Sequence, residues 1–298
     1  MAQDEAARGG PDVSADLDRA GSRLTVAAGS ARSLLLTVLG ELVYPNGKPV
    51  WTASLLYVLM GIGVEEQTAR QAIARCAAAG WLIGEKHGRE VRWQLTPSVK
   101  RLVEDGMRRV YSLHMRDDPW DGTWLILLVT VPHTHRAVRK KLYGALSWAG
   151  FGNPTPGVWL SPHPERAAEA ERVIADLDLA DSTLSFTGSA MRIGLSEEQV
   201  VRRAWALDDV AAVYEALLDR FSDARPDPGD ATLLTHIELV SQWQRLPFMD
   251  PQLPDELLPD WIGRRAATVI QQRRSEWYED AQTRWLDVVR MTSPAVTS

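Results

Sequence analysis

The sequence predicts an α+β protein built from several domains. Its 298 residues, 45% of them apolar, can bury the cores of two or three domains. The first third combines three stretches of helical apolar spacing with two short β-favouring runs, the middle alternates β-rich and amphipathic runs, and the last third is helical in pattern. The expected divisions are a disordered tail (1–29), a three-helix and hairpin module (30–96), a connecting helix (97–118), a mixed module (119–200) and a helical module (201–298).

Two helices open the first module. Ser30 is placed to cap the run ARSLLLTVLGELVY, in which leucine and valine recur at helical spacing until PNGKP breaks the chain. Thr52 is placed to cap ASLLYVLMGIG, which ends at two glycines. Thr96 is placed in the same way to cap PSVKRLVEDGMRRVYSLHM, the connecting helix. Each run has an apolar stripe that we expect to be buried.

A third helix and a hairpin complete this module. Within residues 64–80, projection at about 100° per residue gathers small and apolar side chains on one face and polar ones on the other. The runs WLIGEK and VRWQL then flank the polar link HGRE, which predicts a β-hairpin. The polar helix face and the hairpin carry Gln67, Thr68, Arg70, Gln71 and Arg75 and then Lys86, His87, Arg89 and Arg92.

Positive and negative side chains are unevenly distributed along the chain. Residues 31–116 hold 12 Lys and Arg against 7 Asp and Glu, although the whole chain has a formal net charge of −6. Residues 206–298 hold 9 Lys and Arg against 16 Asp and Glu. A polyanion would therefore be attracted to the first module and repelled by the last.

Three helices followed by a basic hairpin are the layout of a winged helix-turn-helix. In such a module the third helix enters the major groove, where Arg and Gln contact base edges, and the hairpin lies along phosphates. The alternative for each polar residue alone is an ordinary solvated surface, but their combination in one basic segment predicts binding to double-stranded DNA. The predicted DNA contacts are Thr52, Gln67, Thr68, Arg70, Gln71, Arg75, Lys86, His87, Arg89 and Arg92.

Composition argues against a disulfide-bonded, metal-binding or membrane-spanning protein. The single cysteine, Cys76, excludes an intramolecular disulfide and a cysteine-based zinc cluster, and it fits a cytoplasmic protein. No apolar run reaches the roughly 20 residues of a membrane span. His133 and His135 are spaced like metal ligands but have no cysteine or nearby carboxylate, so we expect no metal site and no cofactor.

The middle module begins with a continuous apolar strand, WLILLVTVP (124–132), followed by a basic helix, strand material in GFGNPTPGVWLSP, an amphipathic helix and the strand STLSFTGS.

A metal nuclease needs a carboxylate at the end of the first strand, where this chain has Val131-Pro132, so we expect no nuclease activity. Nor is there a Walker loop, a dinucleotide fingerprint or a nucleophile elbow. Arg136 and Arg139 on the basic helix could hold phosphates of a ligand or simply solubilise the helix.

Tryptophan is abundant after residue 120, in the second and third modules. An aromatic ligand would need an apolar cavity with a few fixed polar groups. Such side chains are also the usual content of a core, and either role is compatible with the pattern. The candidate effector contacts are Arg136, Arg139, Trp159, Trp205, His236, Trp243 and Arg245, with Trp261 as a further possible lining residue.

Several segments in series resemble one family. ARSLLLTVLGELV, TARQAIARCAAAGWL, GREVRWQLT, WDGTWLILLVTVP, GFGNPTPGVWLSP, RRAWALDD and DPQLPDELLPDWIGRRA follow in the order seen in PaaX-like proteins, the phenylacetate-degradation repressors of bacteria. The resemblance covers about residues 31–290. It implies a winged-helix N-terminal domain, a central ferredoxin-like α+β domain akin to small CRISPR adaptation nucleases, and a helical C-terminal domain.

The resemblance also implies a function. Members of the family are homodimeric transcriptional regulators, mostly repressors released by an aryl-CoA thioester such as phenylacetyl-CoA. Arg70 and Arg75 fall on the arginines of the family's recognition helix, and Arg89 falls on its wing turn. The segment THIELVSQWQRLPFMDPQLP lacks an expected arginine, which would suit a different ligand. The alternatives are an activator, a regulator of another ligand or of none, and, less in keeping with the motifs, a nuclease or a CoA-thioester hydrolase.

Overall fold

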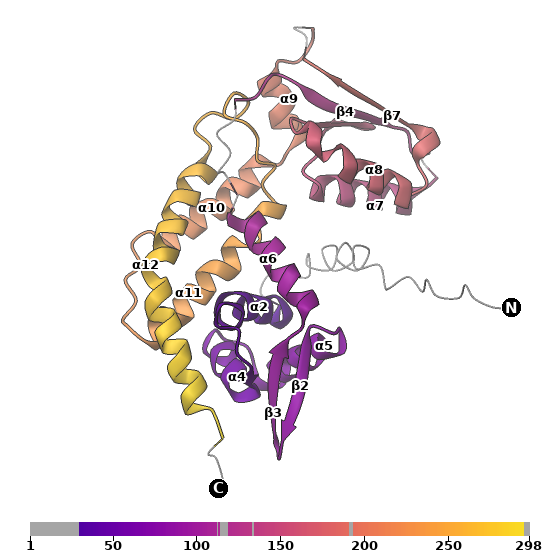
Figure 1. Ribbon diagram of the computed structural model, residues 1–298. Coiled ribbons are helices and arrows are strands. Elements are labelled where there is room, and N and C mark those ends of the chain that lie inside the picture. The colour runs from indigo at the N-terminus through magenta and orange to yellow at the C-terminus, as the bar shows by residue number, and fades with distance from the viewer. Residues whose placement is uncertain (1–29, 112, 114–118, 133, 191–192, 295–298) are drawn as a thin grey trace, which may run out of the picture. The chain divides into compact units, whose positions relative to one another are not determined.

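The computed structural model describes residues 30–111, 113, 119–132, 134–190 and 193–294 (Figure 1). The predicted tail (1–29), most of the end of the connecting segment and His133 lie outside these residues. The chain forms two compact units. Unit 1 contains residues up to Met107 with Asp227–Ser241 and the segment from Glu279, and unit 2 contains Arg108–Pro226 with Gln242–Tyr278.

Unit 1 begins with the first predicted helix, which is interrupted. Helix α2 (Ala31–Val38) starts at Ser30, whose hydroxyl accepts a hydrogen bond from the amide of Ser33 at 3.2 Å, so the predicted cap is confirmed. A π-helical turn, η1 (Leu39–Val43), follows before the short α3 (Tyr44–Asn46). Such a wide turn inserts a residue into the helical ladder. It carries Glu41, which is buried.

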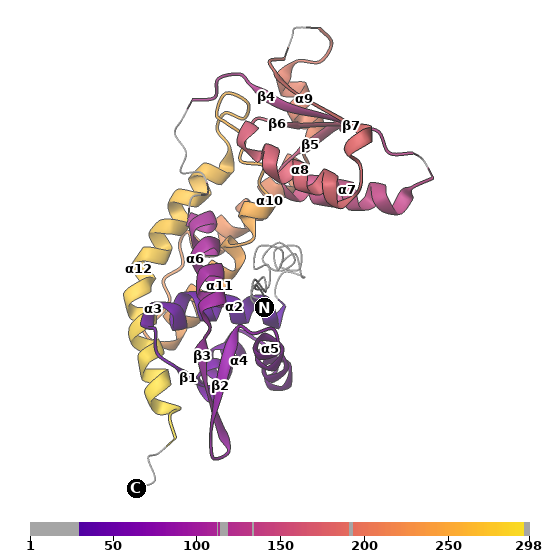
Figure 2. The same ribbon diagram turned by 45° about the vertical axis from the view of Figure 1, so that its right-hand side comes forward.

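Two helices and a three-stranded sheet complete the winged module. Helix α4 (Thr52–Gly61) and helix α5 (Glu66–Ala78) follow the strand β1 (Val50–Trp51). Strands β2 (Leu82–His87) and β3 (Glu90–Leu95) form the predicted antiparallel hairpin, and β1 pairs with β3 on its other edge. In both views the tip of this hairpin extends beyond α4 and α5 (Figures 1 and 2).

The core of unit 1 includes residues from the far end of the sequence. Leu233 and Ile237 of α11 (Asp230–Trp243) and Trp285 of α12 (Ile262–Met291) lie in one buried cluster with the apolar stripes of α2, α4 and α5. Hydrogen bonds reinforce this packing, from Asn46 to Gln282 at 2.8 Å and between Ser54 and Thr292 at 2.7 Å. The winged module is therefore completed by C-terminal helices, which local sequence pattern does not reveal.

Helix α6 (Pro97–Tyr111) begins at Thr96, whose hydroxyl accepts a hydrogen bond from the amide of Val99, as predicted. The sheet of unit 2 then has the order β5-β6-β4-β7, with every neighbouring pair antiparallel. Its strands are β4 (Trp124–Val129), β5 (Gly152–Thr155), β6 (Val158–Ser161) and β7 (Thr183–Gly188). Helices α7 (Arg136–Trp148) and α8 (Ala167–Asp176) cover one face (Figures 1 and 2).

This β-α-β-β-α-β arrangement is the ferredoxin-like fold. The pattern had suggested one strand in GFGNPTPGVWLSP, and the structure shows two strands joined at Pro156-Gly157. The positive φ of Gly157, 83°, allows this tight reversal. The sequence pattern does not reveal this hairpin, because each of its strands has only four residues.

The helical module also differs from its expected outline. The spacing of RRAWALDDVAAVYEALLDRFSD predicts one helix from Arg202, but the chain is extended at Trp205, which separates α9 (Glu197–Ala204) from α10 (Leu207–Phe221). Helix α9 packs against β5 of the ferredoxin-like sheet, whereas Tyr214 of α10 packs against Trp243 and Trp261. Among the described residues, no helix is both long and apolar enough to cross a membrane.

Candidate nucleic-acid interface

Helix α5 has the two faces that its sequence predicts. Ala69, Ala72, Ile73 and Cys76 are buried against α2 and α4. The opposite face is exposed and carries Gln67, Thr68, Arg70, Gln71 and Arg75. Burial also raises the pKa of the Cys76 thiol to about 11, partly offset by the charges of Arg32 and Arg75, so the thiol is neutral near pH 7. The helix is thus fixed by its apolar side and presents donors and acceptors to solvent.

The two arginines of this face are held by residues one turn earlier. Arg70 donates from Nε and Nη2 to the same carboxylate oxygen of Glu66, at 2.9 and 2.7 Å. Arg75 donates from Nη2 to the side-chain oxygen of Gln71 at 3.4 Å and from Nε to its backbone oxygen at 3.3 Å. Both contacts follow the i,i+4 spacing that brings side chains together on a helix.

The wing presents its cations at the tip. Lys86, His87 and Arg89 are exposed, and Gly88, with φ of 62°, makes the turn between the strands. His87 lies 3.3 Å from a carboxylate oxygen of Glu85 on the same strand. The exposed lysine and arginine have the reach and charge to contact a phosphate backbone.

Arg92 lies farther from the tip, at the base of the wing. Its guanidinium carbon is 5.8 Å from the ring centroid of Trp51, the residue that it opposes in the β1–β3 ladder. His87 packs edge-on against the same ring, with centroids 5.3 Å apart. Trp51 therefore contacts two of the predicted DNA-contacting side chains, Arg92 and His87.

Thr52 does not cap α4 as its sequence position predicts. It is the first residue of α4 and not its N-cap, and the N-cap Trp51 makes no side-chain cap hydrogen bond. The Thr52 hydroxyl donates to the backbone oxygen of Val91 at 3.2 Å and accepts from Trp93 Nε1 at 2.9 Å. The single hydroxyl proton of Thr52 is donated within the protein, and Thr52 thereby links the wing to α4.

Sequence reasoning missed two contributors to this surface, Glu66 and Trp51. The Glu66–Arg70 contact has a local signal, a glutamate four residues before an arginine on a polar helix face. Trp51 has a weaker signal, because its pairing with Arg92 depends on the register of a two-residue strand, β1.

The candidate effector contacts are divided between the two units, and those within unit 2 have different neighbours. His236 of α11 is in unit 1, fully buried, with Nε2 3.0 Å from a carboxylate oxygen of Glu41. Trp159 of β6 is fully buried between the ferredoxin-like sheet and its helices, where its ring meets Tyr143 edge-on at 4.8 Å. Arg136 is exposed on α7, and Arg139 donates from Nη2 to the backbone oxygen of Val131 at 3.1 Å.

The remaining candidates are in two further neighbourhoods of unit 2. Trp205 stacks with Trp124, with centroids 6.4 Å apart, and donates from Nε1 to the backbone oxygen of Gly150. Trp243 is buried, donates to the backbone oxygen of Val110 and lies near Tyr214. Arg245 is half-buried at the start of a 3₁₀ turn, η4 (Leu246–Phe248).

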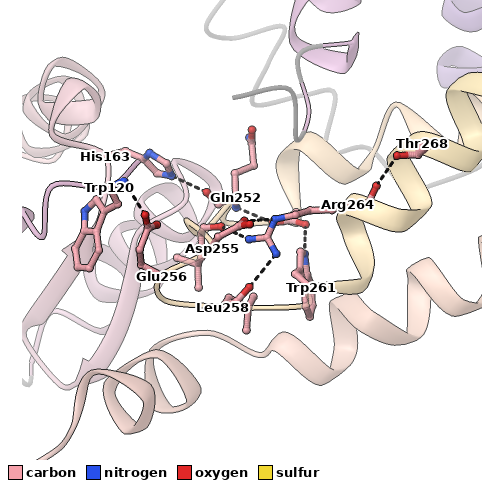
Figure 3. Close-up of polar contacts among 11 residues, drawn as sticks. Trp120, His163, Gln252, Asp255, Glu256, Leu258, Trp261, Arg264 and Thr268 are labelled. Carbon is pink, nitrogen blue, oxygen red and sulfur yellow. Dashed lines mark hydrogen bonds and ion pairs between the residues drawn. The ribbon is translucent and has the colours of Figure 1, made fainter. Parts of the chain in front are cut away.

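The proline-rich segment between α11 and α12 is held by many polar contacts (Figure 3). His163 Nε2 lies 2.9 Å from the backbone oxygen of Gln252, and a Glu256 carboxylate oxygen accepts from the amide of Trp120 at 3.2 Å. Arg264 pairs with Asp255 and donates to the backbone oxygen of Leu258 at 2.9 Å.

A buried carboxylate fixes the start of the same segment. Asp250 accepts hydrogen bonds from the Tyr214 hydroxyl at 2.7 Å and from Trp261 Nε1 at 2.8 Å. Burial, together with the Asp250 charge and hydrogen bond, raises the pKa of Tyr214 well above its usual range. Trp261 thus has a structural partner, and the segment is anchored to the ferredoxin-like domain on one side and to α10 on the other.

Within the part of the chain that the structure describes, no group of three or more His, Cys, Asp or Glu side chains could hold a metal ion. Unit 1 instead presents an exposed polar face of α5 and a wing with cationic side chains at its tip, both packed on one buried core.

Three consecutive parts of the chain match models of one protein family. Residues 30–99 match the PaaX-like protein model, residues 117–200 the PaaX protein central Cas2-like domain, and residues 205–287 the PaaX-like protein C-terminal domain. A curated relative, the transcriptional repressor PaaX of Escherichia coli strain K12, is 29% identical over 251 residues, which are 80% of this chain and 77% of the relative.

A solved structure supports the fold. The uncharacterized protein Rv0674 from Mycobacterium tuberculosis matches with a TM-score of 0.58 at 23% identity, covering 84% of this chain and 96% of that chain. Because the family models match all three modules in order and well over half of the residues, the chain belongs to the PaaX-like family.

Proposed function

We propose that this protein is a dimeric transcriptional repressor that binds operator DNA through α5 and the wing and is released by a small effector of the aryl-CoA class. One observation carries the DNA-binding part: the exposed face of α5 holds five side chains able to contact base edges, beside a wing with exposed cations at its tip. The name of the Escherichia coli relative, a transcriptional repressor, supports the regulatory part.

The electrostatics of the chain fit this assignment. The basic surplus lies in residues 31–116, which include α5 and the wing, and the rest of the chain is acidic. Phosphate contacts by Lys86 and Arg89 would provide affinity without sequence preference, and the side chains of α5 would provide discrimination.

DNA binding is tested by fluorescence anisotropy of labelled duplex from the protein's own upstream region, at fixed salt. We expect a dissociation constant at least about a thousandfold lower than for scrambled duplex of the same length. Equal affinity for both duplexes would contradict the proposal, because phosphate contacts alone do not distinguish sequences.

A twofold dimer would give the discrimination that one recognition helix lacks, since paired half-sites lie about 34 Å apart on DNA. The face of the ferredoxin-like sheet opposite α7 and α8 supports a second copy as the partner. Leu128, Leu184 and Phe186 lie side by side on that face and are 37%, 60% and 52% exposed. An apolar patch of this kind can pack against its own copy about a twofold axis.

The dimer is tested by sedimentation of variants. Phe186→Asp should convert a dimer to a monomer and weaken operator binding. Thr187→Asp is the matched control, because Thr187 is the exposed next residue on β7 and its side chain points to the other face. A dimer that survives Phe186→Asp and Leu184→Asp would place the interface elsewhere.

The effector part rests on the family and on the tryptophan-rich composition of unit 2. We propose Arg136 as a phosphate contact, and Trp205 and Arg245 as the candidates that retain solvent-accessible surface for a ligand. The effector would favour the conformer in which the two winged modules are misplaced for the operator.

This part is tested by adding phenylacetyl-CoA to the preformed DNA complex, with coenzyme A alone as the control. Release by the thioester and not by coenzyme A would support the aryl-CoA class. A DNA complex that neither phenylacetyl-CoA nor coenzyme A dissociates would indicate that the protein responds to another ligand or to none.

A further inference from the structure

The geometry points to Glu66 as a specificity-determining residue that positions Arg70 for base recognition and opposes binding to non-specific DNA. This inference rests on the proposed function, because it concerns the same recognition helix. Glu66 is the first residue of α5, and Arg70 follows one turn later on the same exposed face.

The contact uses one edge of the guanidinium. Nε and Nη2 of Arg70 both donate to a single oxygen of Glu66, at 2.9 and 2.7 Å. Within the described residues, these are the hydrogen bonds that Arg70 makes, so the edge formed by the outer hydrogens of Nη1 and Nη2 is not used. That outer edge is the one suited to two parallel hydrogen bonds with O6 and N7 of guanine.

The pair is accessible from outside the protein. The side chain of Arg70 is 56% exposed and that of Glu66 is 52% exposed. Neither side chain contributes to the buried core of unit 1. Replacing Glu66 therefore changes the order and charge of the recognition face without opening a cavity.

Glu66 acts in two ways on a DNA complex. First, it restricts the rotamers of a long side chain before binding, so less conformational entropy is lost when Arg70 meets its base. Second, its negative charge repels phosphates wherever Arg70 has no guanine to contact, which disfavours non-specific sites. Both effects raise the ratio of specific to non-specific affinity.

The chain offers a matched control one residue away. Glu65 precedes α5, is exposed, and contributes its backbone oxygen to the helix, accepting from the amide of Ala69. Among the described residues its carboxylate has no arginine partner. Glu65→Gln and Glu66→Gln thus remove the same charge from neighbouring positions, and only the second weakens the contact with Arg70, because an amide oxygen accepts more weakly than a carboxylate oxygen.

The experiment measures dissociation constants for two duplexes at fixed salt. One is the duplex that the wild-type protein enriches from a random-sequence library, and the other is a scrambled version of it. Glu65→Gln, Glu66→Gln, Arg70→Ala and the double variant Glu66→Gln/Arg70→Ala are compared with wild type. Thermal unfolding monitored by circular dichroism confirms that all of them are folded.

We expect Glu66→Gln to lower the ratio of specific to scrambled affinity about two- to tenfold, and Glu65→Gln to shift both affinities equally. In the Arg70→Ala background, Glu66→Gln should leave the ratio unchanged, since its partner is absent. Equal effects of Glu65→Gln and Glu66→Gln on the ratio would overturn the inference alone. A wild-type protein that enriches no sequence would overturn the proposed function as well.

Discussion

The outer face of α5 and the candidate effector residues differ in how far their side chains reach solvent. On α5 every predicted contact is exposed, and the arginine at its centre, Arg70, is 56% exposed in its side chain. Trp159 and His236, by contrast, are fully buried, and Trp243 is only 2% exposed. The spacing of polar residues on an amphipathic helix predicts that they are exposed. An aromatic residue, by contrast, suits a ligand pocket and a core equally well, so its sequence position does not predict exposure.

The two sets should therefore respond differently to substitution. Changes on α5 should alter DNA affinity with little loss of stability, and changes at the buried candidates should alter stability first. Three variants test that contrast, from the largest expected effect to the smallest, and a fourth extends the series to a partly exposed ion pair.

Trp159→Ala should lower the free energy of unfolding by about 3–5 kcal/mol, because it leaves a cavity between the ferredoxin-like sheet and its helices. Trp159→Phe should cost less than half as much, since the ring against Tyr143 is kept and Nε1 has no hydrogen-bond partner among the described residues. Urea denaturation measures both. A small loss for Trp159→Ala, with altered ligand binding, would instead assign Trp159 to a ligand site.

His236→Ala should lower the free energy of unfolding by about 3 kcal/mol, because it removes the Nε2 contact from a carboxylate, Glu41, that is 3% exposed. The control is His87→Ala on the wing, where the histidine and its partner Glu85 are both exposed, and its cost should be below about 1 kcal/mol. Similar losses for the two variants, measured by chemical denaturation, would show that the buried pair adds no stability of its own.

Arg70→Ala should weaken binding to operator DNA by about 1–3 kcal/mol and change the free energy of unfolding by less than about 0.5 kcal/mol. The reason is that, among the described residues, Arg70 hydrogen-bonds to Glu66, whose side chain is exposed. Anisotropy and urea denaturation of the same preparation give the two values. Equal losses of affinity on operator and scrambled DNA would identify Arg70 as a phosphate contact.

Asp230→Asn should cost about 0.5–1 kcal/mol at neutral pH, because it removes a partly exposed ion pair between α11 and α12. The guanidinium of Arg284 lowers the pKa of Asp230, with help from the Tyr57 hydroxyl. A lowered folded-state pKa means that this stabilisation is present above the ordinary value of 3.8 and is lost as the pH falls through the lower folded value. Denaturation at neutral and acidic pH should show the variant and wild type converging in acid.

Local pattern predicted the elements of the winged module well. The spacing of leucines, the caps at Ser30 and Thr96, and the two faces of α5 depend on residues within a few positions of one another, and the structure has all of them. The cap at Thr52 was wrong, because the hydroxyl is taken by Val91 and Trp93, about forty residues away. Side-chain preferences decide a cap only where no distant group competes.

The sequence by itself thus determined the α+β class, the winged helix and the exposed polar face of α5, since each follows from short-range periodicity and charge. Only the tertiary structure decided that helices α11 and α12 supply Leu233, Ile237 and Trp285 to the buried core of unit 1, and that His236 lies against Glu41. The contact between His236 and Glu41 joins residues 195 positions apart. Because apolar burial is non-directional, a periodic apolar stripe predicts that a helix face is buried but does not predict which element covers it.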